Sequence, residues 1–180
     1  MFSTMSTSNH KKVWDKYGLP EKVRRHCRKV SEVAEEIAWK TGANIEIVRE
    51  GALLHDIGRA VTHDPFYHFI ASGEILREEG YDERIVRIAE RHFSSGMTAE
   101  EAKTFDLPPG DYMPHTLEEK TVSLADNIVF GDKRAKFDQF LKRLDELEEQ
   151  DKEKAWFTWR TRERANEIRR ELEELSGLKF

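Results

Sequence analysis

The sequence predicts an all-α protein, a compact bundle of several helices without a significant sheet. Apolar residues recur at spacings of three and four along almost the whole chain, which is the period of an amphipathic helix. No stretch shows the alternation of apolar and polar residues that marks a half-buried strand. Charged residues make up 36% of the chain and hydrophobic residues 38%, a balance that suits solvated helix faces over a modest core.

The length of 180 residues fits one domain. The Ser- and Thr-rich start predicts a flexible N-terminal tail over residues 1–12, followed by a single helical domain over residues 13–180. Residues 20–130 hold the motifs described below, and residues 131–180 are expected to add C-terminal helices.

The first long helix is expected from Pro20 to about Gly42, because proline is favoured at the first helical position. A second helix begins after Asn44, a residue type that caps helix N-termini. It leads to the sequence HDIG at residues 55–58, where Gly58 is expected to supply the left-handed residue that ends many helices.

A loop is expected over residues 61–67, and helices near residues 68–79 and 82–93, with Gly80 closing the first of them.

Two matches to the capping box S/T-x-x-E predict the next helix starts. Thr98 with Glu101 forms the first match, and Thr116 with Glu119 forms the second. The helix that begins at the second match carries Asp126.

Two charged amphipathic helices are expected after Gly131. We place Phe137 and Phe140 on the inner face of the first, and Trp156 and Trp159 on the inner face of the second. Aromatic residues also anchor subunit interfaces, which leaves a homodimer open.

The composition excludes several classes of protein. A net charge of −5 gives no overall basic field, which argues against a dedicated nucleic-acid binder. The single cysteine, Cys27, cannot form an intramolecular disulfide. No run of about 18 apolar residues is present to span a membrane. We therefore expect a cytoplasmic protein.

Five potential metal ligands fall on the apolar faces of these helices: His26, His55, Asp56, His92 and Asp126. A single inward histidine is more often a satisfied core residue, and a single inward aspartate a tether between helices. Several together are costly to bury without a shared cation. Nitrogen and carboxylate ligands suit divalent Fe, Mn, Co, Ni or Zn, and water on such a metal becomes a hydroxide nucleophile suited to attack at phosphorus.

These residues resemble the HD superfamily of phosphohydrolases, whose ligands follow the order His, His-Asp, Asp. Here the order is His26, His55-Asp56 and Asp126, and the surrounding ALLHDIGR and SLADNI are similar to the family's motifs. The resemblance covers residues 20–130. It implies an HD-domain bundle and metal-dependent hydrolysis.

His68 and His92 resemble the extra ligands of the two-metal branch of that superfamily. The resemblance implies a second ion, with Asp56 bridging the two. Some two-metal relatives have paired histidines where this chain has His92 and Phe93, so one or two ions remain open.

Arg59 stands where some one-metal nucleotidases of the superfamily carry a glutamate. We interpret Asp56 and Arg59 as catalytic residues, with Arg59 also clamping a substrate phosphate through parallel hydrogen bonds. The alternative is a surface arginine that closes a helix.

His63 and Asp64 lie in the loop after the motif and are interpreted as substrate-binding residues, although exposed polar residues are ordinary there. We interpret His10 and His115 as surface residues.

The expected function is metal-dependent hydrolysis of a phosphomonoester or phosphodiester bond in a nucleotide or related small phosphorylated metabolite. The first alternative is a metal- or nucleotide-binding or regulatory module without turnover. The second is a helical scaffold in which the inward histidines and aspartates pair with one another. Metal content separates the scaffold from the other two.

Overall fold

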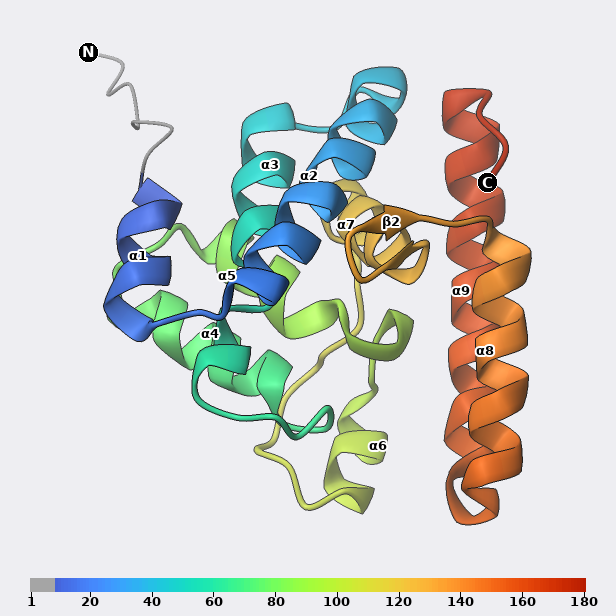
Figure 1. Ribbon diagram of the computed structural model, residues 1–180. Helices are drawn as coiled ribbons and strands as arrows, with labels where there is room; N and C mark the ends of the chain where they lie inside the picture. Colours follow the sequence, from blue (N-terminus) through green and yellow to red (C-terminus); the bar gives the residue numbers. More distant parts are fainter. Residues whose placement is uncertain (1–8) are drawn as a thin grey trace.

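The structure, a computed structural model, describes residues 9–180, and its helices confirm the predicted all-α class (Figure 1). The helices are α1 (Asn9–Tyr17), α2 (Glu21–Thr41), α3 (Ile45–Leu54), α4 (His68–Glu78), α5 (Glu83–Arg91), α6 (Ala99–Thr104), α7 (Leu117–Asn127), α8 (Phe137–Gln150) and α9 (Ala155–Ser176). The short elements are the 3₁₀ helices η1 (Ile57–Ala60), η2 (Phe93–Ser95) and η3 (Lys152–Lys154), and the strands β1 (Val129–Phe130) and β2 (Lys133–Arg134). The two strands form one antiparallel hairpin.

The predicted caps define the helix ends. The Asn44 side chain accepts a hydrogen bond at the start of α3, and Gly42, with φ of 82°, ends α2 in the left-handed conformation. Thr98 and Thr116 begin α6 and α7 with complete capping boxes. These local signals determine where each helix begins, and burial then determines which face packs inward.

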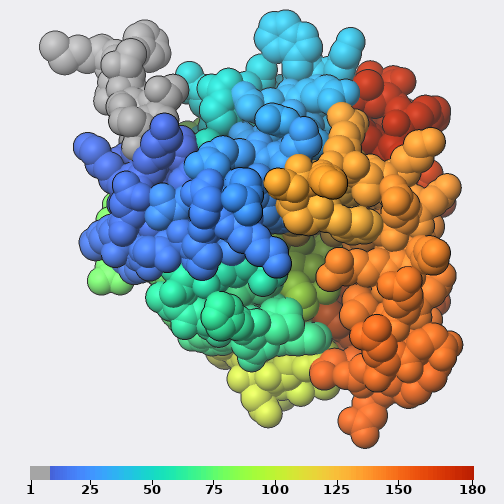
Figure 2. Space-filling view, in the orientation of Figure 1, coloured from blue at the N-terminus to red at the C-terminus, as the bar shows by residue number. Residues whose placement is uncertain are grey.

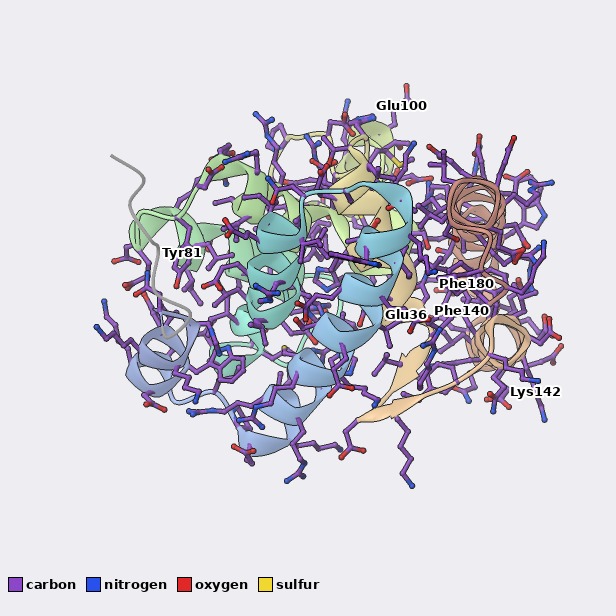
Figure 3. All side chains as sticks on the ribbon, turned by 90° about the horizontal axis from the view of Figure 1, so that it is seen from above. Glu36, Tyr81, Glu100, Phe140, Lys142 and Phe180 are labelled. Carbon is purple, nitrogen blue, oxygen red and sulfur yellow. The ribbon has the colours of Figure 1, made fainter. Side chains whose placement is uncertain are left out.

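The main core lies between α2, α3, α5 and α7, which contact one another along their apolar faces. The pair α8 and α9 stands along one edge of this group (Figure 1). Phe140 of α8 points toward the body of the molecule and Lys142 points outward (Figure 3). None of the helices within residues 9–180 has both the length and the apolar character needed to cross a membrane.

The first helix corrects the predicted N-terminal tail. Residues 1–8 of that tail lie outside the described residues, whereas residues 9–12 belong to α1. Trp14 anchors α1, because its side chain is fully buried and its Nε1 donates to the backbone oxygen of Leu53 at 3.0 Å. His10 lies one turn earlier against the Trp14 ring, so it is buried and not the expected surface residue.

Two further expectations are wrong. Gly58 is not the left-handed end of α3, since α3 ends at Leu54 and Gly58 lies inside η1. Its lack of a side chain instead lets η1 approach α4 closely. Trp156 and Trp159 are 42% and 51% exposed, because the buried face of α9 is the one that contains Phe157.

Candidate metal centre

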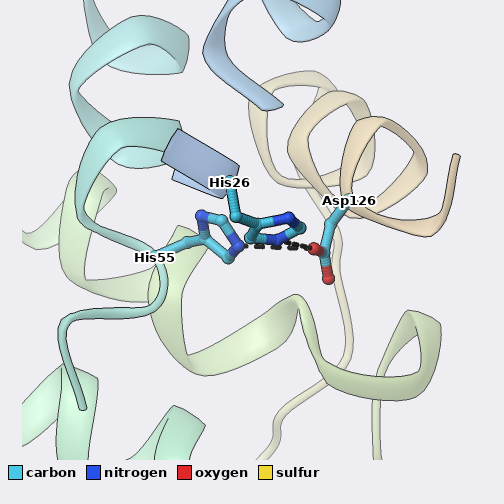
Figure 4. A group of neighbouring side chains, drawn as sticks. All are labelled: His26, His55 and Asp126. Carbon is cyan, nitrogen blue, oxygen red and sulfur yellow. Dashed lines mark hydrogen bonds and ion pairs between the residues drawn. The ribbon is translucent and has the colours of Figure 1, made fainter. Parts of the chain in front are cut away.

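Four histidines and two aspartates converge in the interior from five parts of the chain. His26 comes from α2, His55 and Asp56 from the junction of α3 and η1, His68 from the start of α4, His92 from the end of α5, and Asp126 from α7. Figure 4 shows His26, His55 and Asp126 pointing toward one another. All six predicted metal ligands are thus brought together.

Every one of the four imidazole rings is held by its Nδ1 atom. The contacts are His26 Nδ1 to Gly131 O at 2.7 Å, His55 Nδ1 to Ala52 O at 2.6 Å, His68 Nδ1 to Pro65 O at 2.9 Å and His92 Nδ1 to Ala89 O at 2.7 Å. A carbonyl oxygen only accepts, so each Nδ1 carries a hydrogen and donates it. In a neutral ring, Nε2 is then left with a lone pair.

The Nε2 atoms point at the two carboxylates in two groups. In the first half-site, Asp126 Oδ1 lies 2.9 Å from His26 Nε2 and 3.4 Å from His55 Nε2. In the second half-site, Asp56 Oδ1 lies 3.2 Å from both His68 Nε2 and His92 Nε2.

Asp56 connects the two half-sites. Its Oδ2 lies 3.5 Å from His55 Nε2 and 3.7 Å from His26 Nε2, while its Oδ1 faces the second half-site. One carboxylate therefore presents an oxygen to each half-site.

The donor set fits a bound cation better than a network of hydrogen bonds. Among residues 9–180, the buried atoms His55 Nε2 and Asp56 Oδ1 find no hydrogen-bond partner. His68 Nε2 and His92 Nε2 face each other at 3.1 Å, although their Nδ1 atoms already hold the ring hydrogens. Lone pairs directed at one another and at carboxylates repel unless protons or a cation lie between them. Imidazole nitrogen with carboxylate oxygen suits a divalent transition metal.

The same geometry shifts the pKa values of the buried groups. Burial opposes charge on Asp56, but the imidazoles of His55, His68 and His92 outweigh it and hold the pKa of this carboxyl well below its usual range. Burial also opposes charge on His55, yet the Asp56 carboxylate helps to raise the pKa of His55 well above its usual value, so that without an ion a proton on His55 Nε2 takes the place of the cation between the ring and the carboxylates. The site thus favours ionised carboxylates at neutral pH.

The centre is more open on the side of the first half-site. The side chains of His26 and Asp126 are 16% and 22% exposed, whereas those of His55, His68 and His92 are at most 2% exposed. Figure 2 shows a hollow in the surface between α2 (blue), the segment after η1 (teal) and the orange hairpin and α8. The helix α2 carries His26, and the hairpin and α8 follow Asp126 in the chain.

Arg59 lies at the edge of this centre. Its Nε donates to Asp56 Oδ2 at 3.0 Å, and its side chain is 36% exposed. The Asp56 carboxylate raises the pKa of the Arg59 guanidinium further, so the charge is permanent.

The structure does not bring His63 and Asp64 into the cluster. Both are exposed in the loop between η1 and α4. Asp64 Oδ1 accepts from the backbone nitrogen of Phe66 at 2.9 Å, which orders the approach to His68. Their contact with substrate stays a prediction.

Sequence reasoning missed the Gly131 carbonyl that holds His26. It lies in the turn of the hairpin, 105 residues along the chain. The Gly131-Asp132 pair is a turn signal, but a backbone oxygen carries no side-chain signal of its contact with a ligand.

Comparison with known proteins identifies relatives that share this part of the chain. A profile of the HD domain family matches residues 23–130. An uncharacterised protein of Methanocaldococcus jannaschii is 48% identical over 130 residues, covering 69% of this chain and 76% of that protein. A tRNA (cytidine(56)-2'-O)-methyltransferase of Thermoplasma volcanium is 46% identical over 69% of this chain and 36% of its own length. Ribonuclease Y of Treponema denticola is 31% identical over 72% of this chain and 23% of its own length.

A solved HD domain shares this fold. The HD domain of the L. monocytogenes phosphodiesterase PgpH, in complex with cyclic-di-AMP, matches with a TM-score of 0.56 at 21% identity, over 95% of this chain and 98% of that chain. The matched region is most of the M. jannaschii protein but about a third of the methyltransferase and about a quarter of the ribonuclease.

Proposed function

This chain belongs to the HD-domain family, and on that premise we propose that it is a metal-dependent phosphohydrolase. Its substrate would carry a phosphomonoester or phosphodiester bond, in a nucleotide or a related small phosphorylated metabolite. The observation that carries the proposal is the common orientation of the four imidazoles. Each donates Nδ1 to a backbone carbonyl, and each directs Nε2 toward Asp56 or Asp126.

Two ions fit this arrangement. His26, His55 and Asp126 would hold the first, His68 and His92 the second, and Asp56 would contact both. Divalent metals bound in such sites lower the pKa of water and neutralise charge on phosphoryl oxygens.

The chain's own residues position the reacting groups. The backbone carbonyls fix the orientation of the rings, so the Nε2 atoms need little rearrangement to bind. Arg59 uses Nε to hold Asp56. Among residues 9–180 its terminal nitrogens make no hydrogen bond, which leaves them available for two phosphoryl oxygens.

Two facts support a small nucleotide as the substrate class. The PgpH domain of similar fold was solved with cyclic-di-AMP. The net charge of −5 provides no basic track for a long polyanion, although one relative is a ribonuclease by name.

Metal analysis and hydrolysis test the proposal together. We would purify the protein without chelator and compare wild type with His55→Ala and His92→Ala. The control is His115→Ala, since His115 is an exposed histidine whose ring contacts Asp111 outside the cluster. Each protein would be assayed with bis(p-nitrophenyl) phosphate and p-nitrophenyl phosphate in Mn²⁺.

The expected result is about two metal ions per chain in wild type and in His115→Ala, with metal and activity both lost in the other two variants. One ion, lost only in His55→Ala, would indicate a single-metal enzyme. Bound metal without hydrolysis of any phosphoester would favour the binding module. A protein that binds no metal would overturn the proposal in favour of the scaffold.

A further inference from the structure

The backbone directly after His92 is strained. Ser94 has φ of 54° and ψ of 31°, Ser95 has φ of 58°, and Gly96 follows with φ of 115°. Residues with a side chain adopt this left-handed conformation at an energetic cost, whereas glycine adopts it freely. Strain of this kind persists where the surrounding structure holds it, and it concentrates at functional sites. Glycine would adopt the Ser95 conformation without strain, so the use of the Ser95 side chain is the feature to explain.

Ser95 uses its side chain to reach α7. The Asn127 Nδ2 atom donates to Ser95 Oγ at 2.8 Å. Ser95 is fully buried and Asn127 is 8% exposed. A buried side-chain hydrogen bond is directional, and breaking it leaves a polar group without water. It therefore fixes how η2 sits against the end of α7.

The two ends of this bond belong to different half-sites. Ser95 lies three residues after His92, whose Nε2 is 3.2 Å from Asp56 Oδ1 in the second half-site. Asn127 directly follows Asp126, whose Oδ1 contacts His26 Nε2 in the first half-site. Adjacent helical residues point about 100° apart, so α7 can present Asp126 to the centre and Asn127 to η2.

We propose that the hydrogen bond between Ser95 and Asn127 is a latch that sets the spacing of the two half-sites. Ser95 and Asn127 are positioning residues: they act through His92 and Asp126 and touch no substrate. The inference rests on the metal-holding part of the proposed function and not on hydrolysis. Groups that orient metal ligands typically change metal affinity by about 10- to 100-fold.

Mn²⁺ titration of the metal-free full chain, followed by electron paramagnetic resonance and calorimetry, tests the latch. The test variants are Ser95→Gly and Asn127→Ala. The controls are Ser94→Gly, which relieves strain next to the latch, and Ser123→Ala. Ser123 is buried on α7 one turn before Asn127, and within the described part of the chain its Oγ has no hydrogen-bond partner to lose.

We expect the weaker Mn²⁺ site to lose about 10- to 100-fold in affinity in both test variants and to be unchanged in both controls. Ser95→Gly also removes backbone strain, so its melting temperature should fall less than that of Asn127→Ala. If the two variants lose equal Mn²⁺ affinity while their melting temperatures differ, a general loss of stability cannot be the cause. The double variant Ser95→Gly/Asn127→Ala should bind Mn²⁺ no more weakly than the weaker single variant, because both substitutions remove the same hydrogen bond.

The outcomes separate the two proposals. If wild type binds two Mn²⁺ ions and both test variants stay within twofold of it, the latch is overturned and the hydrolase proposal stands. If wild type binds Mn²⁺ with the expected losses in the variants but hydrolyses no phosphoester, the latch stands and the proposed activity fails. A wild type that binds no Mn²⁺ overturns both.

Discussion

Replacement of Gly58 by alanine should destabilise the protein through a specific collision. A Cβ at this position would lie 2.7 Å from Ser72 N and 2.8 Å from Ser72 Oγ, and nearer still to the carbonyl oxygen of His68. Two of these three atoms belong to the backbone of α4, so no side-chain rotation relieves the contact. The helix α4 would have to move away from η1, and His68 is its first residue.

The magnitude follows from two effects. Overpacking of a buried site typically costs about 1–3 kcal/mol. Movement of α4 also weakens the hydrogen bond from Gly58 N to Ser72 Oγ at 2.8 Å, and a buried N–H without a partner costs about 1–3 kcal/mol. Alanine lowers the conformational entropy of the unfolded chain, which offsets about 0.4–1 kcal/mol of this destabilisation. We expect a net loss of about 1–5 kcal/mol in the free energy of unfolding.

Urea unfolding of metal-free protein, followed by circular dichroism, measures this loss. Ser72→Ala removes the hydrogen bond without the collision and should cost less than Gly58→Ala. Gly73→Ala is a matched glycine control on α4, where the three atoms nearest to the new Cβ all belong to the Glu90 side chain and none to the backbone. It should cost less than Gly58→Ala, because displacing Glu90 weakens its ion pair with Arg77 but leaves α4 in place. A Gly58→Ala protein within about 0.5 kcal/mol of wild type would refute the reasoning.

Three other predictions concern stability. Glu119→Ala should cost about 3–5 kcal/mol, because Glu119 is almost fully buried and its loss leaves Arg91 as an unpaired, largely buried charge; chemical denaturation measures it. Asp82 caps α5, and hydrogen bonds from Arg84 lower its pKa to about 2. Because the folded pKa is lowered, the stability that Asp82 contributes should be complete above about pH 5 and lost as the pH falls toward 2; unfolding of wild type and Asp82→Ala across this range checks it. Chelation should lower the melting temperature, and Mn²⁺ should restore it, since an ion at 100 times its Kd adds about 2.7 kcal/mol.

Each of these three has a result that contradicts it. An unfolding free energy for Glu119→Ala close to wild type would mean that the buried pair with Arg91 is not formed. A constant difference between wild type and Asp82→Ala down to pH 2 would contradict the lowered pKa. An unchanged melting temperature in chelator, with metal removed as shown by elemental analysis, would mean that the centre is already satisfied without an ion.

The sequence was sufficient to predict helix ends, because caps are local. Asn44, Thr98 and Thr116 each accept from the backbone nitrogen three residues ahead, so the signal and its effect lie within one turn. The choice of buried face is less local. In α9, Trp156 and Phe157 are neighbours that point about 100° apart, and the sequence offers a stripe for either. The face of Phe157 is buried because it meets the aromatic cluster of residues 66–112.

The ligands were predictable for a similar reason, and their arrangement was not. Polar residues at inward positions stand out in an amphipathic pattern, and His55 and Asp56 do so as adjacent residues. The roles of all six ligands stay predictions, although the structure places them together. The family resemblance implied that Asp56 bridges two ions, but helix periodicity alone does not place it between two half-sites, because that depends on the angles at which α2, α4, α5 and α7 pack.

The segment over residues 126–131 explains why the first half-site depends on long-range contacts. Three of the histidines are held by a carbonyl three residues earlier in the chain, so the support of each ring is local. His26 has its support in the Gly131 carbonyl. The same segment supplies Asp126 to the centre and Asn127 to η2. A displacement of this short segment would therefore move Asp126, turn the ring of His26 and break the hydrogen bond to Ser95 near His92. Both half-sites thus respond to the position of the segment.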